Sequence, residues 1–424
     1  MFVSVWPQLA HPNAVLVPEI VFWLMAAAAL NDGTMGASVL TFWTSLAAVC
    51  PTLRAQSVTE EAFCTARRML PLQFFRALFD AFVKRQHAAQ ANRWLWHGKR
   101  LLGFDGMLVN LPAIQTLRTA FPPPKNQRGT SRHPQALVVG LVGLWSGLCY
   151  SFLMVPQAQA EQWCAAWLTR YLQVSDLLLG DRNFANYELM ARILYRRADF
   201  LFRLPANRFH KALRRPTNSG RQDEWLIDMK LPAALRKRAP HLPTMFTVRV
   251  LEYQVPGYRV SWLITSLTDA QTYSYNEVVS LYHQRWNQET MHREWKYTLQ
   301  LSNLRSHGAQ GIQKEVLVQL TLNNVIRAIQ AEALPFDGKP VSLRFLDSKR
   351  LINTAISNMA MAPIAELPAL YVNLLRKIGE LSILVRPGRS YPRKNKGKPR
   401  NKGHGILVPS ARLVETTGAA PCGI

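Results

Sequence analysis

Between residues 101 and 204 the chain alternates short apolar runs with helical segments, and this order restricts the fold more than any other feature of the sequence. Three β-prone runs come first, each bounded by Pro, Gly or Ser: KRLLGFDGMLVNLP, QALVVGLVGLW and CYSFLMVP. A helical segment, the short run LLLG, a second helix over about residues 187–197 and the run DFLFRLP follow. Three sequential strands followed by alternating helices and strands predict an α/β fold with a mixed, partly parallel sheet.

The segment before this sheet, residues 1–95, is predicted to be helical. Ser57 and Glu60 have the spacing of a capping box at the start of a helix that runs to about Leu70. Pro71 suits the start of a second helix, LQFFRALFDAFVKRQ. Two short helices with a tight joint can form a helix-turn-helix that reads DNA ends, or they can simply pack together.

The segments after residue 95 are predicted from their patterning. Residues 96–204 form the first part of the core, and their strand order is that of a ribonuclease-H-like fold. Residues 205–270 form a β-rich insertion subdomain, because MFTVRVLEYQ and YRVSWLITSL read as a hairpin joined at Val255, Pro256 and Gly257. The remaining segments are the helices that close the core and carry Glu289 (271–335), a helical C-terminal region (336–385) and a basic tail that is disordered when free (386–424).

The charge of the chain indicates a polyanionic partner. There are 51 Lys and Arg residues against 26 Asp and Glu residues, a formal net charge of +25. So much charge of one sign repels itself unless DNA, RNA or an acidic membrane surface neutralises it; the alternative is a merely basic soluble protein. The apolar stretch Ile20 to Leu30 is too short to span a bilayer, and the five cysteines form no C-x-x-C pair. We therefore expect a cytoplasmic protein without membrane contact.

Three acids stand out because each has a distinct local context. Asp105 lies inside an apolar strand run and precedes Gly106, Asp181 lies where a strand ends, and Glu289 lies on a helix among basic residues. A strand-edge carboxylate for Asp105 and an Asx-turn for Asp181 are the structural alternatives. If the three meet, they cannot all stay ionised without cations. Two Mg²⁺ ions, which prefer oxygen ligands, would solve that problem and would set up phosphoryl transfer.

The Glu289 helix carries a narrow polar stripe. On an α-helix with 100° per residue, its members project within about 60° of one another. They are Tyr282, Arg285, Glu289 and Lys296. Arg and Lys can hold phosphate oxygens, and Tyr can donate to a phosphate or stack on a base. A solvent-facing helix with ordinary charge neighbours is the structural alternative.

With these residues in view, the chain resembles the DDE transposases of bacterial insertion sequences. Within them it is similar to the "insertion sequence four" type, whose signature Y-x2-R-x3-E-x6-K is complete in the stripe. Asp105 in GFDGM resembles the first family acid, a strand residue followed by Gly. Asp181 in GDRNF resembles the second, which is followed by Arg and then, two residues on, by an aromatic residue. The resemblance covers roughly residues 60–330.

The resemblance implies a ribonuclease-H-like core with a β-rich insertion ahead of the Glu289 helix. It implies that Asp105, Asp181 and Glu289 are the catalytic residues and bind two Mg²⁺ ions, for which Mn²⁺ can substitute. It also implies cut-and-paste transposition by repeated phosphoryl transfers, through hairpin DNA ends. The implied partners are double-stranded DNA, as terminal inverted repeats and target, and a second copy of the chain in a homodimer on DNA. A bacterial cytoplasmic protein associated with the nucleoid follows.

The implied DNA contacts come from the stripe, from the residue after the second acid, and from the insertion. They are Tyr282, Arg285, Lys296, Arg182 and Trp262. In the family, an aromatic residue of the insertion holds a base flipped out of the hairpin. Trp262 is the candidate for that role and Trp225 is a second choice; a core-facing strand Trp is the alternative for Trp262.

Two other functions compete with transposition. One is a ribonuclease-H-like nuclease that cuts without joining, although such a nuclease does not need the Tyr-Arg-Glu-Lys stripe. The other is a domesticated basic DNA- or RNA-binding protein without catalysis, although such a protein could lose Asp105 or Asp181 without consequence. Short inverted repeats on either side of the gene would favour the transposase.

Overall fold

The computed structural model describes residues 15–31, 35–49, 57–126, 129–205, 215–255, 259–335 and 341–383. The described residues belong to one compact unit that ends at Ile383. The predicted basic tail, residues 386–424, lies outside the described residues.

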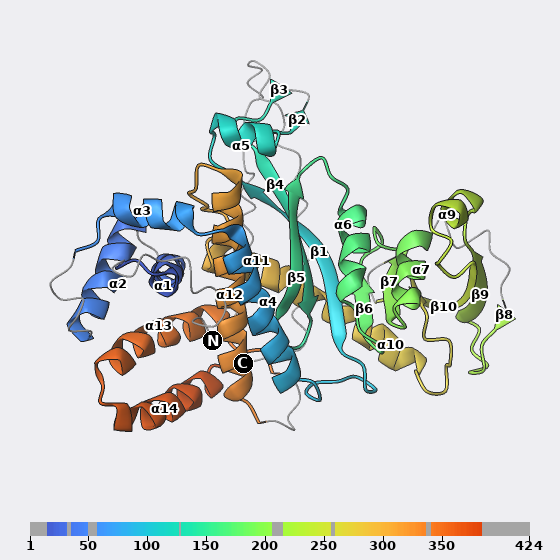
Figure 1. The fold of residues 1–424 in the computed structure, drawn as a ribbon. Helices are drawn as coiled ribbons and strands as arrows, with labels where there is room; N and C mark the ends of the chain where they lie inside the picture. Colours follow the sequence, from blue (N-terminus) through green and yellow to red (C-terminus); the bar gives the residue numbers. More distant parts are fainter. Residues whose placement is uncertain are drawn as a thin grey trace, which may run out of the picture. The chain divides into compact units, whose positions relative to one another are not determined.

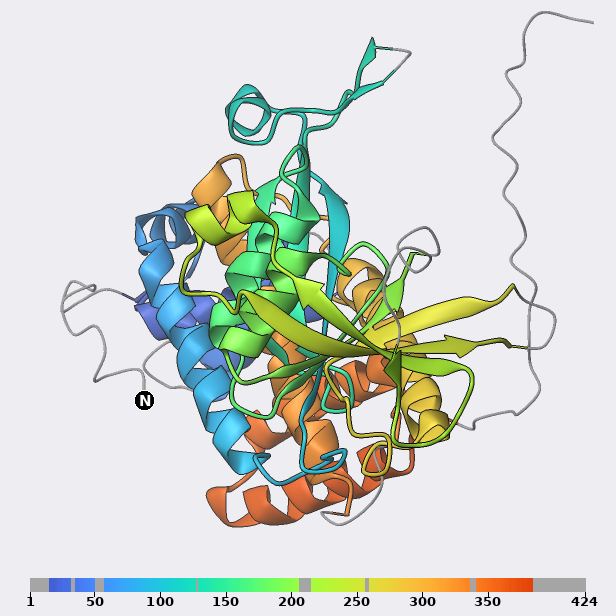
Figure 2. The same ribbon diagram turned by 90° about the vertical axis from the view of Figure 1, so that its right-hand side faces the viewer.

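A nine-stranded sheet runs through this unit in the order β5-β4-β1-β6-β7-β11-β10-β9-β8 (Figure 1). Its strands are β1 (Leu101–Asn110), β4 (Gln135–Gly143), β5 (Cys149–Pro156), β6 (Leu177–Gly180), β7 (Asp199–Leu204), β8 (Arg215–Pro216), β9 (Glu224–Lys230), β10 (Met245–Tyr253) and β11 (Ser261–Thr265). The strands β2 (Lys125–Asn126) and β3 (Gly129–Thr130) pair separately, and Figure 2 shows them projecting away from the large sheet.

Helices precede, interrupt and follow the strands along the chain. They are, in chain order, α1 (Pro18–Leu30), α2 (Met35–Val49), α3 (Glu60–Met69), α4 (Leu72–Ala89), α5 (Gln115–Ala120), α6 (Glu161–Leu168), α7 (Tyr187–Tyr195), α9 (Ala233–Arg238), α10 (Tyr275–Tyr282), α11 (Trp286–Arg293), α12 (Ala309–Glu332), α13 (Phe345–Met361) and α14 (Leu367–Gly379). Two short non-α segments adjoin α11: the 3₁₀ turn η3 (His283–Arg285) and the π-helical turn η4 (Glu294–Thr298). None of the described helices is both long enough and apolar enough to cross a bilayer.

The part of the sheet built by residues 101–204 has the register that the sequence predicts. β4 pairs antiparallel with both β1 and β5. β1, β6 and β7 pair parallel, because α6 and α7 each carry the chain back across the sheet before the next strand begins. The prediction of an α/β fold with a mixed sheet is therefore confirmed.

The β-rich insertion adds strands to this same sheet. β10 and β11 form the predicted antiparallel hairpin, with Trp262 opposite Glu252; the predicted joint at residues 256–257 lies outside the described residues. β11 also pairs with β7 of the core, with Ile264 opposite Phe202. Backbone pairing therefore continues from the core into the insertion without a break.

Side-chain alternation gives the two faces of the core strands different neighbours. On one face, even-numbered residues such as Leu102 and Phe104 of β1 pack with α6 and α7. On the other face, odd-numbered residues such as Met107 and Val109 pack with α4 and α12. Leu101, on the same odd-numbered face, packs with α10. The first acid, Asp105, belongs to this second face.

The α3–α4 pair is built into the core. α3 begins at Glu60, and the side chain of Thr59 accepts from the backbone N–H of Ala62, so the prediction that Ser57 caps this helix is wrong. Thr59 is the better cap because it lies directly before the helix, where its oxygen reaches a free N–H of the first turn. α4 begins directly after Pro71, as predicted, and three of its Phe residues are buried in the main apolar cluster. This burial favours simple packing over DNA reading for the pair.

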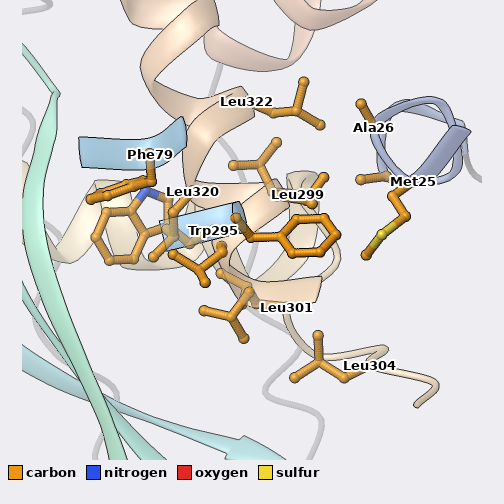
Figure 3. Packing of buried hydrophobic residues seen from close by; sticks show 14 of the residues in the cluster. Met25, Ala26, Phe79, Trp295, Leu299, Leu301, Leu304, Leu320 and Leu322 are labelled. Carbon is orange, nitrogen blue, oxygen red and sulfur yellow. The ribbon is translucent and has the colours of Figure 1, made fainter. Parts of the chain in front are cut away.

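The end of the Glu289 segment is anchored in that same cluster. Trp295 of η4 is fully buried, and its Nε1–H donates to Asn323 of α12 over 3.0 Å. Figure 3 shows Trp295 beside Phe79 of α4 and Leu320 of α12. The segment that carries Glu289 is thereby fixed to the helices behind the sheet.

Candidate active site

Asp105 and Asp181 lie on adjacent strands and face the same side of the sheet. β1 pairs parallel with β6, with Gly103 opposite Leu179. The same register extended by two residues brings Asp105 level with Asp181, which directly follows β6. Alternate residues share a face, and Leu177 and Leu179 pack with α10, so both acids face the α10–α11 segment.

A glycine lets α11 approach β1 closely. A Cβ atom at Gly103 would lie 2.4 Å from Oε1 of Gln288, so a larger side chain would push the helix away. Gln288 is fully buried, and its side-chain amide makes no hydrogen bond among the described residues. One turn further along, Nδ1 of His292 lies 3.6 Å from Oδ2 of Asp105. Glu289 lies between these two contacts in the sequence, so α11 holds it beside the strand that carries Asp105.

The predicted stripe does not lie on one continuous α-helix. The segment changes from α10 to the 3₁₀ turn η3, then to α11 and to the π-helical turn η4. Tighter and wider turns change the angle per residue, so the 100° projection does not hold over this length. Tyr282 is only 6% exposed and belongs to an apolar cluster, and burial raises its pKa to about 12. Tyr282 is therefore buried among apolar side chains, and its contact with DNA stays a prediction.

Arg285 is the charged neighbour that links two of the acids. Its Nη2 donates to Oε1 of Glu289 over 2.9 Å, and its side chain is 14% exposed. Burial works to lower the pKa of Arg285, but Tyr282 and Glu289 raise it overall. Its positive charge also acts to lower the pKa of Asp105. Arg285 therefore lies within electrostatic range of the acids of both the strand and the helix.

Asp105 holds its proton more tightly than an ordinary carboxyl. Burial, then the nearby carboxylate of Glu161, raise its pKa to about 7, although the Gly106 N–H and Arg285 act to lower it. His292 does not help, because burial lowers its pKa to about 4 and leaves the ring neutral at pH 7. The 3.6 Å contact between His292 and Asp105 is therefore not an ion pair at that pH.

Glu161 is a fourth acid at this place, and it was not predicted from the sequence. It is the first residue of α6, on the opposite face of the sheet from α11. Its Oε2 accepts from Nδ2 of Asn183 over 3.0 Å, and burial raises its pKa. Local patterning held no signal for this residue, because a Glu in the first turn of a helix is ordinary.

The other predicted residues around the second acid have plainer surroundings. Oδ1 of Asp181 accepts from the backbone N–H of Asn183 over 2.8 Å, which is the Asx-turn that was the structural alternative for this residue. An Asx-turn uses one oxygen and leaves the other available. Arg182 is exposed, and Lys296 is half-buried on η4.

Trp262 and Trp225 lie in the insertion strands. Trp262 is half-buried, its Nε1–H donates to Oε2 of Glu252 over 3.0 Å, and it packs against the apolar cluster under α6 and α7. Trp225 packs against the same cluster. These contacts agree with the packing alternative for Trp262, and the base-holding role stays a prediction.

The donor chemistry of the site suits a hard divalent cation. Among the described residues, no group of three or more His, Cys, Asp or Glu side chains is arranged to hold a metal ion as the side chains stand. The three predicted acids instead accept hydrogen bonds from protein groups. Asp105 accepts from the Gly106 N–H, Asp181 accepts from the Asn183 N–H, and Glu289 accepts from Arg285. Carboxylate oxygens are nevertheless the ligands that Mg²⁺ and Mn²⁺ prefer, and burial together with the nearby Glu161 makes the charged form of Asp105 unfavourable without a further cation.

Known proteins match the chain over most of its length. A family model for the transposase DDE domain matches residues 114–324, a range that contains Asp181 and Glu289 and begins after Asp105. The transposase InsG for insertion sequence element IS4 of Escherichia coli (strain K12) is 25% identical over 348 residues, which cover 81% of this chain and 77% of InsG. The cryo-EM structure of the piggyBac transposase synaptic complex with hairpin DNA matches with a TM-score of 0.42 and 12% identity, over 92% of this chain and 82% of that chain.

The family model and the IS4 relative agree with the resemblance read from the acids and from the Tyr-Arg-Glu-Lys signature. They favour a transposase over a nuclease that only cuts and over a binding protein without catalysis. These matches support a DDE transposase of the IS4 type, a metal-dependent enzyme that cleaves and joins DNA.

Proposed function

We propose that Asp105, Asp181 and Glu289 hold two Mg²⁺ ions, or Mn²⁺ in their place, and that the chain cuts and joins the ends of its own element at this site. The observation that carries the proposal is the position of the strand acids: Asp105 and Asp181 lie level on adjacent parallel strands and face the helix of Glu289. When bound, the ions would activate water for attack and offset the charge that develops on the phosphate.

The core on which these acids lie is proposed to be ribonuclease-H-like. The strand order β5-β4-β1-β6-β7, with three antiparallel strands followed by two parallel ones, supports this assignment. In such open sheets ligands gather where parallel strands end, which is where Asp181 is found. The predicted boundaries of core, insertion and flanking regions stay predictions.

The cationic side chains are proposed to position the DNA backbone. Arg285 would hold a phosphate through its planar fork once a cation takes over its charge pairing with Glu289. Lys296 and the exposed Arg182 would add point contacts to the same strand. Tyr282 is buried, so it would interact with Arg285 inside the protein and would not stack on a base.

The partners proposed are double-stranded DNA with the terminal inverted repeats, target DNA, and a second copy of the chain in a homodimer on DNA. A net charge of +25 favours binding to a polyanion. Transposition is proposed to proceed by cut and paste through hairpin ends, with an aromatic residue of the insertion, Trp262, receiving the flipped base. The protein would act in the bacterial cytoplasm, at the nucleoid.

The test is cleavage of a labelled duplex that carries the element end, taken from the inverted repeats that flank the gene. Asp105→Asn, Asp181→Asn and Glu289→Gln should each abolish Mg²⁺-dependent strand cleavage while leaving end binding within a few-fold of the unmodified chain, because only metal ligation is lost. Binding is measured by fluorescence anisotropy, and products are separated on denaturing gels, where hairpin ends run apart from nicked strands. Near-normal cleavage by any one variant would remove that residue from the metal site.

A further inference from the structure

The residue after Asp105 creates a gap that a fourth carboxylate fills. Successive strand residues face opposite sides of the sheet, so position 106 faces α6 whereas Asp105 faces α11. A Cβ atom at Gly106 would lie 2.6 Å from Oε1 of Glu161, so any other residue would displace this oxygen. The carboxylate of Glu161 therefore reaches from the far face of the sheet to the strand position next to Asp105.

Asn183 connects this carboxylate to the second acid. Its Nδ2 donates to Oε2 of Glu161 over 3.0 Å, and its backbone N–H donates to Oδ1 of Asp181 over 2.8 Å. Gln162, the neighbour of Glu161 in α6, donates to the backbone carbonyl of Asn183 over 2.7 Å. Asn183 holds Oε2 of Glu161, and Oε1 lies close to the position that a Cβ atom of residue 106 would occupy. The Glu161 carboxylate also bonds to the backbone of Gly106 and to the side chain of Asp105.

Glu161 also lacks the cation that a comparable acid has. Glu188, in the first turn of the neighbouring helix α7, pairs with Arg192 and Arg238. No Lys or Arg side chain forms a salt bridge with Glu161 in the part of the chain that the structure describes. The chain has many Lys and Arg residues, yet none of those that the structure describes pairs with this half-buried carboxylate beside two other acids. A bound metal cation would supply the missing positive charge.

We propose that Glu161 is a fourth carboxylate of the divalent-cation site, placed beside Asp105 by the glycine at position 106. This inference rests on the proposed function, because it takes Asp105 and Asp181 to be the other ligands. Glu161 supports the cation directly or through a bound water, and Asn183 keeps it oriented toward the two strand acids.

The test is a titration of the full chain with Mn²⁺, measured by isothermal calorimetry without DNA. Glu161→Gln keeps the size of the side chain and the acceptor for Asn183 but removes the charge. We expect it to weaken Mn²⁺ binding about 10-fold or more, as is usual when a supporting partner of a metal site is lost. Glu188→Gln is the matched control, since it removes a half-buried carboxylate in the first turn of the next helix, and it should leave Mn²⁺ affinity unchanged.

A second variant tests the role of the glycine at position 106 without changing residue 161 itself. Gly106→Ala should weaken Mn²⁺ binding in the unmodified chain, because the new methyl group displaces the Glu161 carboxylate. It should have little further effect in a Glu161→Gln background. Melting temperatures in EDTA show whether each variant is folded, and Glu161→Gln should melt no lower than the unmodified chain because it removes repulsion between carboxylates.

The outcomes separate this inference from the function on which it rests. If Asp181→Asn loses Mn²⁺ affinity and Glu161→Gln keeps it, Glu161 is not part of the cation site and the three-acid site stands. If Asp105→Asn, Asp181→Asn and Glu161→Gln all bind Mn²⁺ like the unmodified chain, both the inference and the proposed metal site are overturned.

Discussion

Asp105→Asn should stabilise the metal-free protein, although it removes a carboxylate of the proposed metal site. The pKa of Asp105 is raised from 3.8 to about 7, with burial as the main cause and Glu161 next. A rise of that size corresponds to about 4 kcal/mol of differential stability between the two protonation states. The Asp105 side chain is 28% exposed, so solvent screening reduces the expected gain to about 2 kcal/mol.

The pH dependence of this gain has a definite sign. A carboxyl with a raised pKa holds its proton more tightly in the folded state, so folding is not penalised below pH 3.8 and carries the full penalty above about pH 7. The advantage of Asp105→Asn over the unmodified chain should therefore be absent near pH 4 and should grow to its maximum by pH 8. Asn carries no charge at any of these values, so its own contribution stays constant.

Thermal melting in EDTA measures the effect. An unfolding entropy of about 2.1 cal/mol/K per residue makes 2 kcal/mol equivalent to about 2 °C for a chain of 424 residues. Mn²⁺ should raise the melting temperature of the unmodified chain more than that of the variant. The difference between their melting temperatures should therefore become smaller. Asp228→Asn, which removes an exposed acid paired with Arg215, is the control and should bring no gain at pH 8. If Asp105→Asn melts at or below the unmodified chain at pH 8, the penalty for ionising Asp105 in the folded state is refuted.

Three further predictions concern the DNA contacts and the insertion. Arg285→Ala and Lys296→Ala should lower cleavage of element ends at least 10-fold while leaving the melting temperature within about 2 °C; unfolding of either variant on circular dichroism would mark a structural role. Arg249→Ala should destabilise the protein by about 3–5 kcal/mol in denaturant titrations, because Arg249 and its partner Glu224 are both fully buried and the acid would be left without its cation. Trp262→Ala should reduce hairpin yield more than first-strand nicking on denaturing gels, and Trp262→Phe should restore it; an equal loss of both steps with a lower melting temperature would indicate packing alone.

The strands of the core could be predicted because each depends on its own local sequence. CYSFLMVP and DFLFRLP are bounded by turn residues, and β5 and β7 occupy these runs almost to the residue. The pairing of β7 with β11 could not be predicted, because it joins segments about sixty residues apart and depends on the packing of the whole sheet. The insertion was therefore expected as a separate subdomain, although its strands extend the core sheet.

The site was predictable at its two strand acids and less so on its helices. Asp105 and Asp181 are fixed by strand register, which follows from the order of the elements. The position of Tyr282 was not predictable, because the 3₁₀ and π turns beside α11 depend on buried anchors such as Trp295. Glu161 could not be identified because its relation to Asp105 depends on a glycine gap between elements that are distant in sequence.

The unbroken sheet has a mechanical consequence for turnover. Because β7 and β11 share backbone hydrogen bonds, the core and the insertion cannot swing apart as two jaws unless that ladder breaks. Any widening needed to admit a duplex or to let products leave is therefore expected in parts of the chain outside this ladder. Asp105 and Asp181 would keep their spacing throughout the cycle, because the register of β1 and β6 sets it.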